Sequence, residues 1–78
     1  NDSHDSVLRS EFWKELDAAL AKLPLEQRSV FVLAEIEQQP YVEIAVIENV
    51  SLGTVKSRLH RAKQRLRRLL PEHVRDAS

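Results

Sequence analysis

Basic side chains gather toward the C-terminal end of this sequence, in a segment that contains no acidic residue. Residues 49–71 carry seven Lys and Arg side chains and have a formal charge of +7. Residues 1–48 carry ten acids against four bases, a formal charge of −6. Over the whole chain twelve bases and twelve acids cancel, so the asymmetry is hidden in the net charge. Such a pattern indicates a polyanionic partner for the basic segment.

Other kinds of chemistry have little support in the sequence. The chain lacks cysteine, which excludes disulfides, thiolate catalysis and cysteine-ligated zinc. Its three histidines are widely separated, so we expect no metal site and no cofactor. The acids between positions 35 and 48 are expected to form a solvated face that balances nearby bases, because no nucleophile accompanies them. We therefore expect that the protein is not an enzyme.

The basic residues belong to a predicted long helix with two different faces. Apolar residues recur at steps of three and four, which is typical of a helix with one buried side. They are Leu52, Val55, Leu59, Ala62, Leu66 and Leu69. Pro71 closes the segment. At ~100° per residue the opposite face carries Gly53, Ser57, His60, Arg61, Gln64 and Arg68.

A short helix and a tight turn are predicted before this long helix. The short helix spans residues 41–48, and the turn consists of residues 49–51. Asn49 tolerates the left-handed conformation that ends many helices, and Ser51 can cap the helix that follows. The side chains that the short helix is expected to bury are Ile44, Ala45 and Ile47.

Two further helices are predicted in the first half of the chain. The first spans residues 6–22 with Ser6 as its N-cap. The second starts beside Pro24, which suits a first-turn position, and its apolar run 30–34 should be the most buried part of the protein. Four helices joined by short turns predict an all-α domain in which the first two helices are antiparallel.

Two aromatic residues lie side by side in the first predicted helix. Phe12 falls on its apolar stripe, whereas Trp13 points about 100° away from that stripe. We expect Trp13 to pack at the boundary of the core, in preference to forming a protein interface.

A short helix, a tight turn and a basic helix form the pattern of a helix-turn-helix. In that motif the first helix lies across the DNA backbone and the second lies in the major groove. A helix in the groove needs small residues near its start, which Gly53, Thr54 and Ser57 supply. It also needs Lys or Arg donors for guanine and phosphate, which Lys56 and Arg61 supply. The pattern favours DNA binding over a merely solvated basic face.

Several runs of residues resemble a known family. One is Tyr41-Val42-Glu43-Ile44-Ala45, and another is Asn49-Val50-Ser51 followed by Leu52 and Gly-Thr-Val-Lys-Ser-Arg-Leu-His-Arg-Ala-Lys at 53–63. These runs, together with Leu23-Pro24 and Gln27-Arg28-Ser29-Val30-Phe31, resemble region 4 of bacterial sigma factors in the sigma-70 family. The likeness is strongest to the extracytoplasmic-function (ECF) group and covers roughly residues 16–70.

The resemblance implies a domain that recognises the −35 promoter element for transcription initiation. It also implies docking on the β flap of the RNA polymerase core, an anti-sigma factor as a further partner, and a place in the bacterial cytoplasm without membrane insertion. Two alternatives stay open, a response-regulator-type helix-turn-helix transcription factor and a helical module that binds a regulatory protein. The basic continuation over residues 65–70 favours the sigma factor over the response regulator.

Individual residues take their expected roles from the same resemblance. The expected base contacts are made by Lys56, Ser57, His60 and Arg61. The expected contacts with the DNA backbone are made by Tyr41, Thr54, Arg58, Lys63 and Arg65. Arg58 lies closer to the apolar stripe than the others do, so an internal salt bridge to Glu43 or Glu48 is an equal alternative for it.

The chain is expected to form one domain over residues 1–78. Residues 1–5 are expected to be the remnant of a linker in a longer polypeptide, residues 41–70 the helix-turn-helix and residues 71–78 a tail. The expected fold is all-α, a small four-helix domain of the winged-helix-like or sigma region 4 type.

Overall fold

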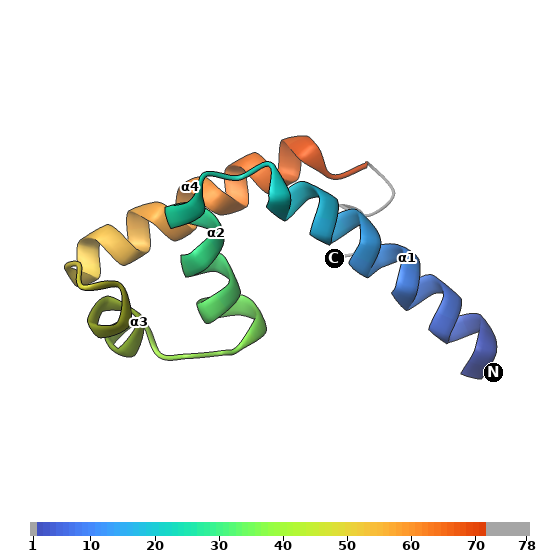
Figure 1. Ribbon diagram of the computed structural model, residues 1–78, viewed down its shortest axis with the longest axis horizontal. Coiled ribbons are helices and arrows are strands. Elements are labelled where there is room, and N and C mark those ends of the chain that lie inside the picture. The colour runs from blue at the N-terminus through green and yellow to red at the C-terminus, as the bar shows by residue number, and fades with distance from the viewer. Residues whose placement is uncertain (1, 72–78) are drawn as a thin grey trace.

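The computed structural model describes residues 2–71, with side chains from Ser10 onward, as a purely helical chain (Figure 1). Its elements are α1 (Asp2–Ala21), α2 (Leu25–Phe31), the π-helical turn η1 (Val32–Ile36), α3 (Tyr41–Glu48) and α4 (Leu52–Leu69). No strand occurs within the described residues, so the predicted all-α class is confirmed and the fold has no β wing there. None of these helices is long and apolar enough to cross a membrane.

Helix α4 is the element against which the other helices pack. It runs along one side of the molecule and contacts α1, α2 and α3 (Figure 1). Its buried side chains are Val55, Leu59, Ala62 and Leu66, the central four of the six predicted from the sequence. The outer two, Leu52 and Leu69, are more than a third exposed because they lie at the two ends of the helix.

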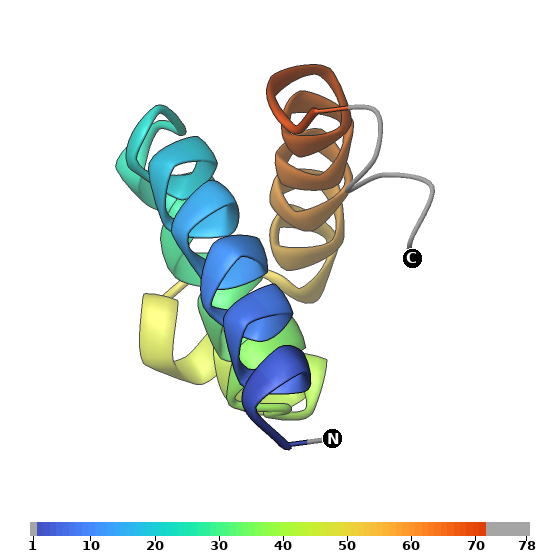
Figure 2. The ribbon, with the colours of Figure 1, turned by 90° about the vertical axis from the view of Figure 1, so that its right-hand side faces the viewer.

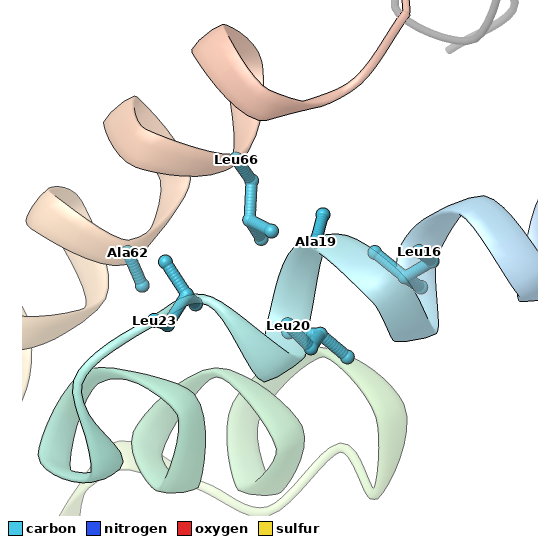
Figure 3. Close-up of a cluster of buried hydrophobic side chains, with 6 residues drawn as sticks. All are labelled: Leu16, Ala19, Leu20, Leu23, Ala62 and Leu66. Atoms are coloured by element: carbon cyan, nitrogen blue, oxygen red, sulfur yellow. The ribbon is translucent and has the colours of Figure 1, made fainter.

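The first of two hydrophobic clusters joins α1 to the C-terminal half of α4. Figure 3 shows Leu16, Ala19 and Leu20 from α1 and Leu23 from the loop that follows, which form one cluster with two α4 side chains. Those two are Ala62, which is completely buried, and Leu66. The small side chain of Ala62 leaves room for Leu23, so the loop lies directly on α4.

The second cluster joins α2, η1 and α3 to the N-terminal half of α4. Its buried members are Val30, Ala34, Ile44, Val55 and Leu59. The apolar run from 30 to 34 was predicted to be the most buried segment, and its two ends are buried whereas its three central residues are half-buried. Those central side chains lie at the edges of the two clusters.

Helix α3 buries fewer side chains than the sequence predicts. Ile44 is completely buried and Ala45 is half-buried, as expected. The prediction for Ile47 is wrong, because its side chain is 55% exposed. A helix of only two turns touches the rest of the protein along one narrow stripe, and Ile47 lies outside that stripe.

The first helix differs from the prediction in its start. It begins at Asp2, so Ser6 lies inside the helix and is not its N-cap. Helices α1 and α2 run in roughly opposite directions, as predicted, and Phe31 of α2 lies against the cluster that α1 forms with α4 (Figures 1 and 2). The N-terminal part of α1 extends away from the other helices, and α4 is the helix against which its C-terminal part packs (Figures 1 and 2).

The aromatic pair of α1 lies at the surface. Phe12 is 37% exposed and does not belong to the core, contrary to its predicted place on the apolar stripe. Trp13 is 47% exposed, and its ring meets that of Phe12 edge to face at 5.7 Å between centroids. Both residues lie on the N-terminal side of the cluster that Leu16 begins.

A turn of π-helix follows α2 where the sequence predicts only a continuing helix. The amide of Glu37 donates to the carbonyl of Val32 at 2.9 Å, five residues back. Gln38 then adopts a positive φ of 56°, and the chain leaves toward α3. At the other end of α2, Pro24 is the N-cap residue and does not lie in the first turn. Its carbonyl accepts from the amide of Arg28 at 3.0 Å.

The contrast between two isoleucines of α3 gives a test of this packing. Replacing Ile44 with Ala should lower the free energy of unfolding by about 2–5 kcal/mol, since it opens a cavity between α3 and α4. Replacing Ile47 with Ala, the same change three residues away on an exposed site, should cost about 0.5 kcal/mol or less. Urea unfolding of both variants measures the two values. Equal losses would contradict the described orientation of α3.

Candidate nucleic-acid interface

The turn between α3 and α4 is fixed by its own hydrogen bonds. Asn49 adopts the left-handed conformation predicted for it, with φ 56° and ψ 50°. The amide of Val50 donates to the carbonyl of Ala45 at 3.0 Å, and that of Asn49 donates to Val46 at 3.2 Å. These two bonds form a Schellman motif, and Val50 packs with Ala45 on the second cluster. The direction in which α4 leaves the turn is therefore set by both backbone and packing.

The first turn of α4 is closed by a side-chain cap. Ser51 has an extended backbone, and its Oγ accepts from the amide of Thr54 at 3.1 Å, so the predicted N-cap is confirmed. The same Oγ lies 2.9 Å from the hydroxyl of Thr54. Because the cap occupies both groups of Thr54, this residue is fixed close to the start of the helix.

Helix α3 is held from behind by a bond to α2. The hydroxyl of Ser29 donates to Oε2 of Glu48, the last residue of α3, at 2.9 Å in a partly buried position. At the other end, Pro40 caps α3 only through its carbonyl, which accepts from the amide of Ile44 at 3.1 Å. Tyr41, the first residue of α3, keeps its side chain 37% exposed. Hydrogen bonds thus fix the start and end of α3, the turn and the start of α4.

The outward face of α4 is polar, basic and free of acids. Its exposed residues are Gly53, Lys56, Ser57, His60, Arg61, Lys63, Gln64, Arg65, Arg67 and Arg68. A Cβ built on Gly53 would meet only the Oγ of Ser51, at 3.9 Å. Packing within the protein therefore does not require a glycine there, and the small residue keeps the outer surface at the start of α4 low.

The four residues expected to contact bases lie together on this face. Lys56, Ser57, His60 and Arg61 are all exposed, over two turns near the start of α4. The hydroxyl of Ser57 donates to the carbonyl of Thr54 at 3.1 Å, which leaves its oxygen lone pairs available to an outside donor. Lys56 and Arg61 form no ion pair within the described part of the chain.

The residues expected near the DNA backbone are more varied in their surroundings. Arg65 is exposed, whereas Thr54 and Arg58 are half-buried beside the apolar stripe. Lys63 pairs with Glu35 of η1, with Nζ to Oε1 at 3.4 Å. Both of these side chains are partly exposed, so the pair stabilises the fold by less than about 1 kcal/mol.

The internal salt bridge considered for Arg58 is not formed. Among the side chains described, those of residues 10–71, the only ion pair joins Lys63 to Glu35, and Glu48 accepts its hydrogen bond from Ser29. Of the acids expected to balance nearby bases, Glu35 does so directly. No three potential metal ligands come together among the described residues. His73 lies outside this range, as does the predicted tail beyond Pro71.

Two residues of this site were missed by the sequence analysis. Glu35 reaches Lys63 across 28 positions of sequence, and the π turn that places it has no pattern of its own in the residue types. Ser29 reaches Glu48 across 19 positions and is one of many polar residues on its helix. An acid that lies near the basic segment only in space gives no periodic pattern by which it could be found.

The geometry of α3, the turn and α4 defines a class of protein. A two-turn helix held from behind, a Schellman turn and a long helix with a bare basic face together form a helix-turn-helix DNA-binding domain.

Comparison with known proteins gives the family. Residues 13–66 match the family described as sigma-70, region 4. The chain is 47% identical over 70 residues to the ECF RNA polymerase sigma factor SigE of Mycolicibacterium smegmatis, covering 90% of this chain and 26% of that protein. It is 38% identical over 66 residues to the ECF RNA polymerase sigma factor SigW of Bacillus subtilis, covering 85% and 35% respectively.

The chain therefore belongs to the sigma-70 region 4 family, and the predicted resemblance is confirmed. This family consists of non-enzymatic domains of transcription initiation factors. The chain spans about a quarter to a third of the length of these relatives.

The cap of α4 gives a test of how the interface is held. Ser51→Ala removes the acceptor for the amide of Thr54 and should lower the free energy of unfolding by about 1 kcal/mol. Ser51→Asp retains an acceptor at the N-cap and should stay close to the wild-type value. Thermal unfolding followed by circular dichroism distinguishes the two. A Ser51→Ala variant as stable as the wild type would show that the turn alone fixes the start of α4.

Proposed function

We propose that this chain is the DNA-binding domain of an ECF sigma factor and that it recognises the −35 promoter element in double-stranded DNA. The observation that carries the proposal is the outward face of α4. This face holds exposed Lys and Arg side chains and no acid, and α4 directly follows a rigid α3 and turn. Seven like charges on one short segment repel one another unless an anion neutralises them. The phosphates of a DNA duplex supply that neutralisation.

The start of α4 is the part that fits the major groove. Gly53 and Ser57 are small, and Lys56 and Arg61 extend beyond them as donors for guanine O6 and N7. Ser57 and His60 lie between Lys56 and Arg61 on the same face, and we assign them to contacts with DNA bases as well. Because the hydroxyl of Ser57 donates its hydrogen bond to the carbonyl of Thr54, its oxygen can accept a hydrogen bond from the amino group of adenine or cytosine.

The far end of α4 has a different role. Each helical residue advances ~1.5 Å, so Arg68 lies about 18 Å along the axis from Lys56. A major groove ~12 Å wide does not present base edges to both ends of such a helix. We assign Arg67 and Arg68 to phosphate or protein contacts, and the same holds for Arg65.

The remaining backbone contacts surround the groove helix. Tyr41 starts the helix that would lie across the DNA backbone, while Thr54, Arg58 and Lys63 flank the base-contacting face. Such contacts fix the register of the domain on the duplex and carry no sequence information.

We further propose that the whole protein acts with the RNA polymerase core in the bacterial cytoplasm. The β flap of polymerase and an anti-sigma factor are its proposed protein partners. Support comes from the relatives, whose names describe them as RNA polymerase sigma factors of the ECF group.

Alanine variants along α4 test which residues contact bases. Lys56→Ala and Arg61→Ala should each cost ~1–3 kcal/mol on the cognate element and relax discrimination at particular base pairs. Arg67→Ala should weaken binding to cognate and to scrambled DNA equally, or have no effect on either. The measurement is a competition titration of each variant against every single-base change in an element found by binding-site selection. If Arg67→Ala altered base preference while the other two changed only overall affinity, α4 would lie in the groove in the opposite sense.

A protein-interaction module is the alternative that this titration also addresses. Such a module would bind neither duplex in a salt-dependent way.

A further inference from the structure

The ion pair between Glu35 and Lys63 is the place where an acid touches the basic face of α4. Nζ of Lys63 lies 3.4 Å from Oε1 of Glu35, and the two side chains are 45% and 39% exposed. Within the described residues no other Lys or Arg has an acidic partner. Glu35 therefore neutralises one particular base of the proposed DNA-binding surface.

The π-helical turn brings this acid to α4. Hydrogen bonds in η1 span five residues, so its backbone is wider than the α-helix before it and displaces the side chains that follow. Ala34 remains buried in the cluster with Val55 and Leu59, and its neighbour Glu35 reaches the side of α4. π turns inside helices occur frequently at functional sites.

Lys63 belongs to one edge of the basic face. It follows Lys56 by seven residues and precedes Arg67 by four, spacings that place all three on the same side of α4. Beyond the base contact of Lys56, a phosphate row that follows this edge of the helix would meet Lys63 and then Arg67. In this row it is Lys63 whose charge is already partly neutralised within the protein.

We propose that Glu35 competes with DNA phosphates for Lys63 and thereby limits the sequence-independent part of DNA binding. The inference rests on the proposed function, and it assigns a role to a residue outside the helix-turn-helix. Because the pair is partly exposed, it weakens the contact of Lys63 with phosphate without abolishing it. Base contacts at the start of α4 are unaffected, so Glu35 lowers the affinity for every duplex by the same factor.

Removing the acid tests the proposal in the 78-residue chain. Glu35→Gln should bind a fluorescein-labelled promoter duplex and a scrambled duplex both about three- to six-fold more tightly at 0.15 M salt, as expected for one added phosphate contact. The slope of log K against log salt should become more negative by up to ~0.9. The readout is fluorescence anisotropy over a series of salt concentrations.

Glu37→Gln is the matched control. It removes the same charge from an exposed residue two positions away that forms no ion pair among the described residues. Its affinity should stay within about two-fold of the wild type, because Glu37 occupies no Lys or Arg side chain of α4 and solvent and salt screen an exposed, unpaired charge. Equal effects of the two changes would overturn the proposal, since net charge alone would then account for them.

The Lys63→Gln background isolates the pair. In that background, Glu35→Gln should change DNA affinity no more than the Glu37→Gln control does. Lys63→Gln, in turn, should weaken DNA binding more in the Glu35→Gln background than in the wild type. An undiminished gain without Lys63 would contradict the proposal. Unchanged melting temperatures establish that each variant is folded. A wild-type chain that bound neither duplex would instead contradict the proposed function.

Discussion

The packing of one narrow apolar stripe of α4 determines the rest of the structure. Val55 and Leu59 join α2 and α3, while Ala62 and Leu66 join α1, so a single helix belongs to both hydrophobic clusters. Because these four residues must face inward, every Lys and Arg side chain of the helix is directed to its flanks or to its opposite side. The same constraint therefore produces the core of the domain and the charged surface that we propose for DNA.

The charge distribution follows from this arrangement. A small domain has little interior in which bases could find buried partners, and α4 itself contributes none of the acids. Among the side chains of residues 10–71, Glu35 is the acid that forms an ion pair with the basic face. The result is a surface with a strong local field on a protein of zero formal net charge. Such a field speeds the approach to DNA and makes the binding dependent on salt.

The sequence predicts best those features that depend on neighbours along the chain. The period of α4, the bounds of α3, the left-handed Asn49 and the cap at Ser51 are all local, and the structure confirms each of them. The helix-turn-helix also follows from the residue pattern, and the family resemblance adds the sigma region 4 identity of the domain. Which α4 residues face outward also follows from periodicity alone.

Features that depend on contacts between distant segments were not predictable in this way. The exposure of Ile47 depends on how little of α3 touches α4, and the packing of α1 on α4 depends on the contact of Leu23 with Ala62. The positive φ of Gln38 and the π turn before it have no residue pattern of their own. The pair of Glu35 and Lys63 combines both difficulties, since a local distortion creates a distant contact.

The salt dependence of DNA binding by the 78-residue chain tests the central claim most directly. If α4 neutralises about four to six phosphates, log K should fall linearly with log salt with a slope of about −3.6 to −5.4. The titration is made with the selected promoter duplex between 0.05 M and 0.2 M salt. A slope close to zero over this range would contradict the assignment of the basic face of α4 to DNA.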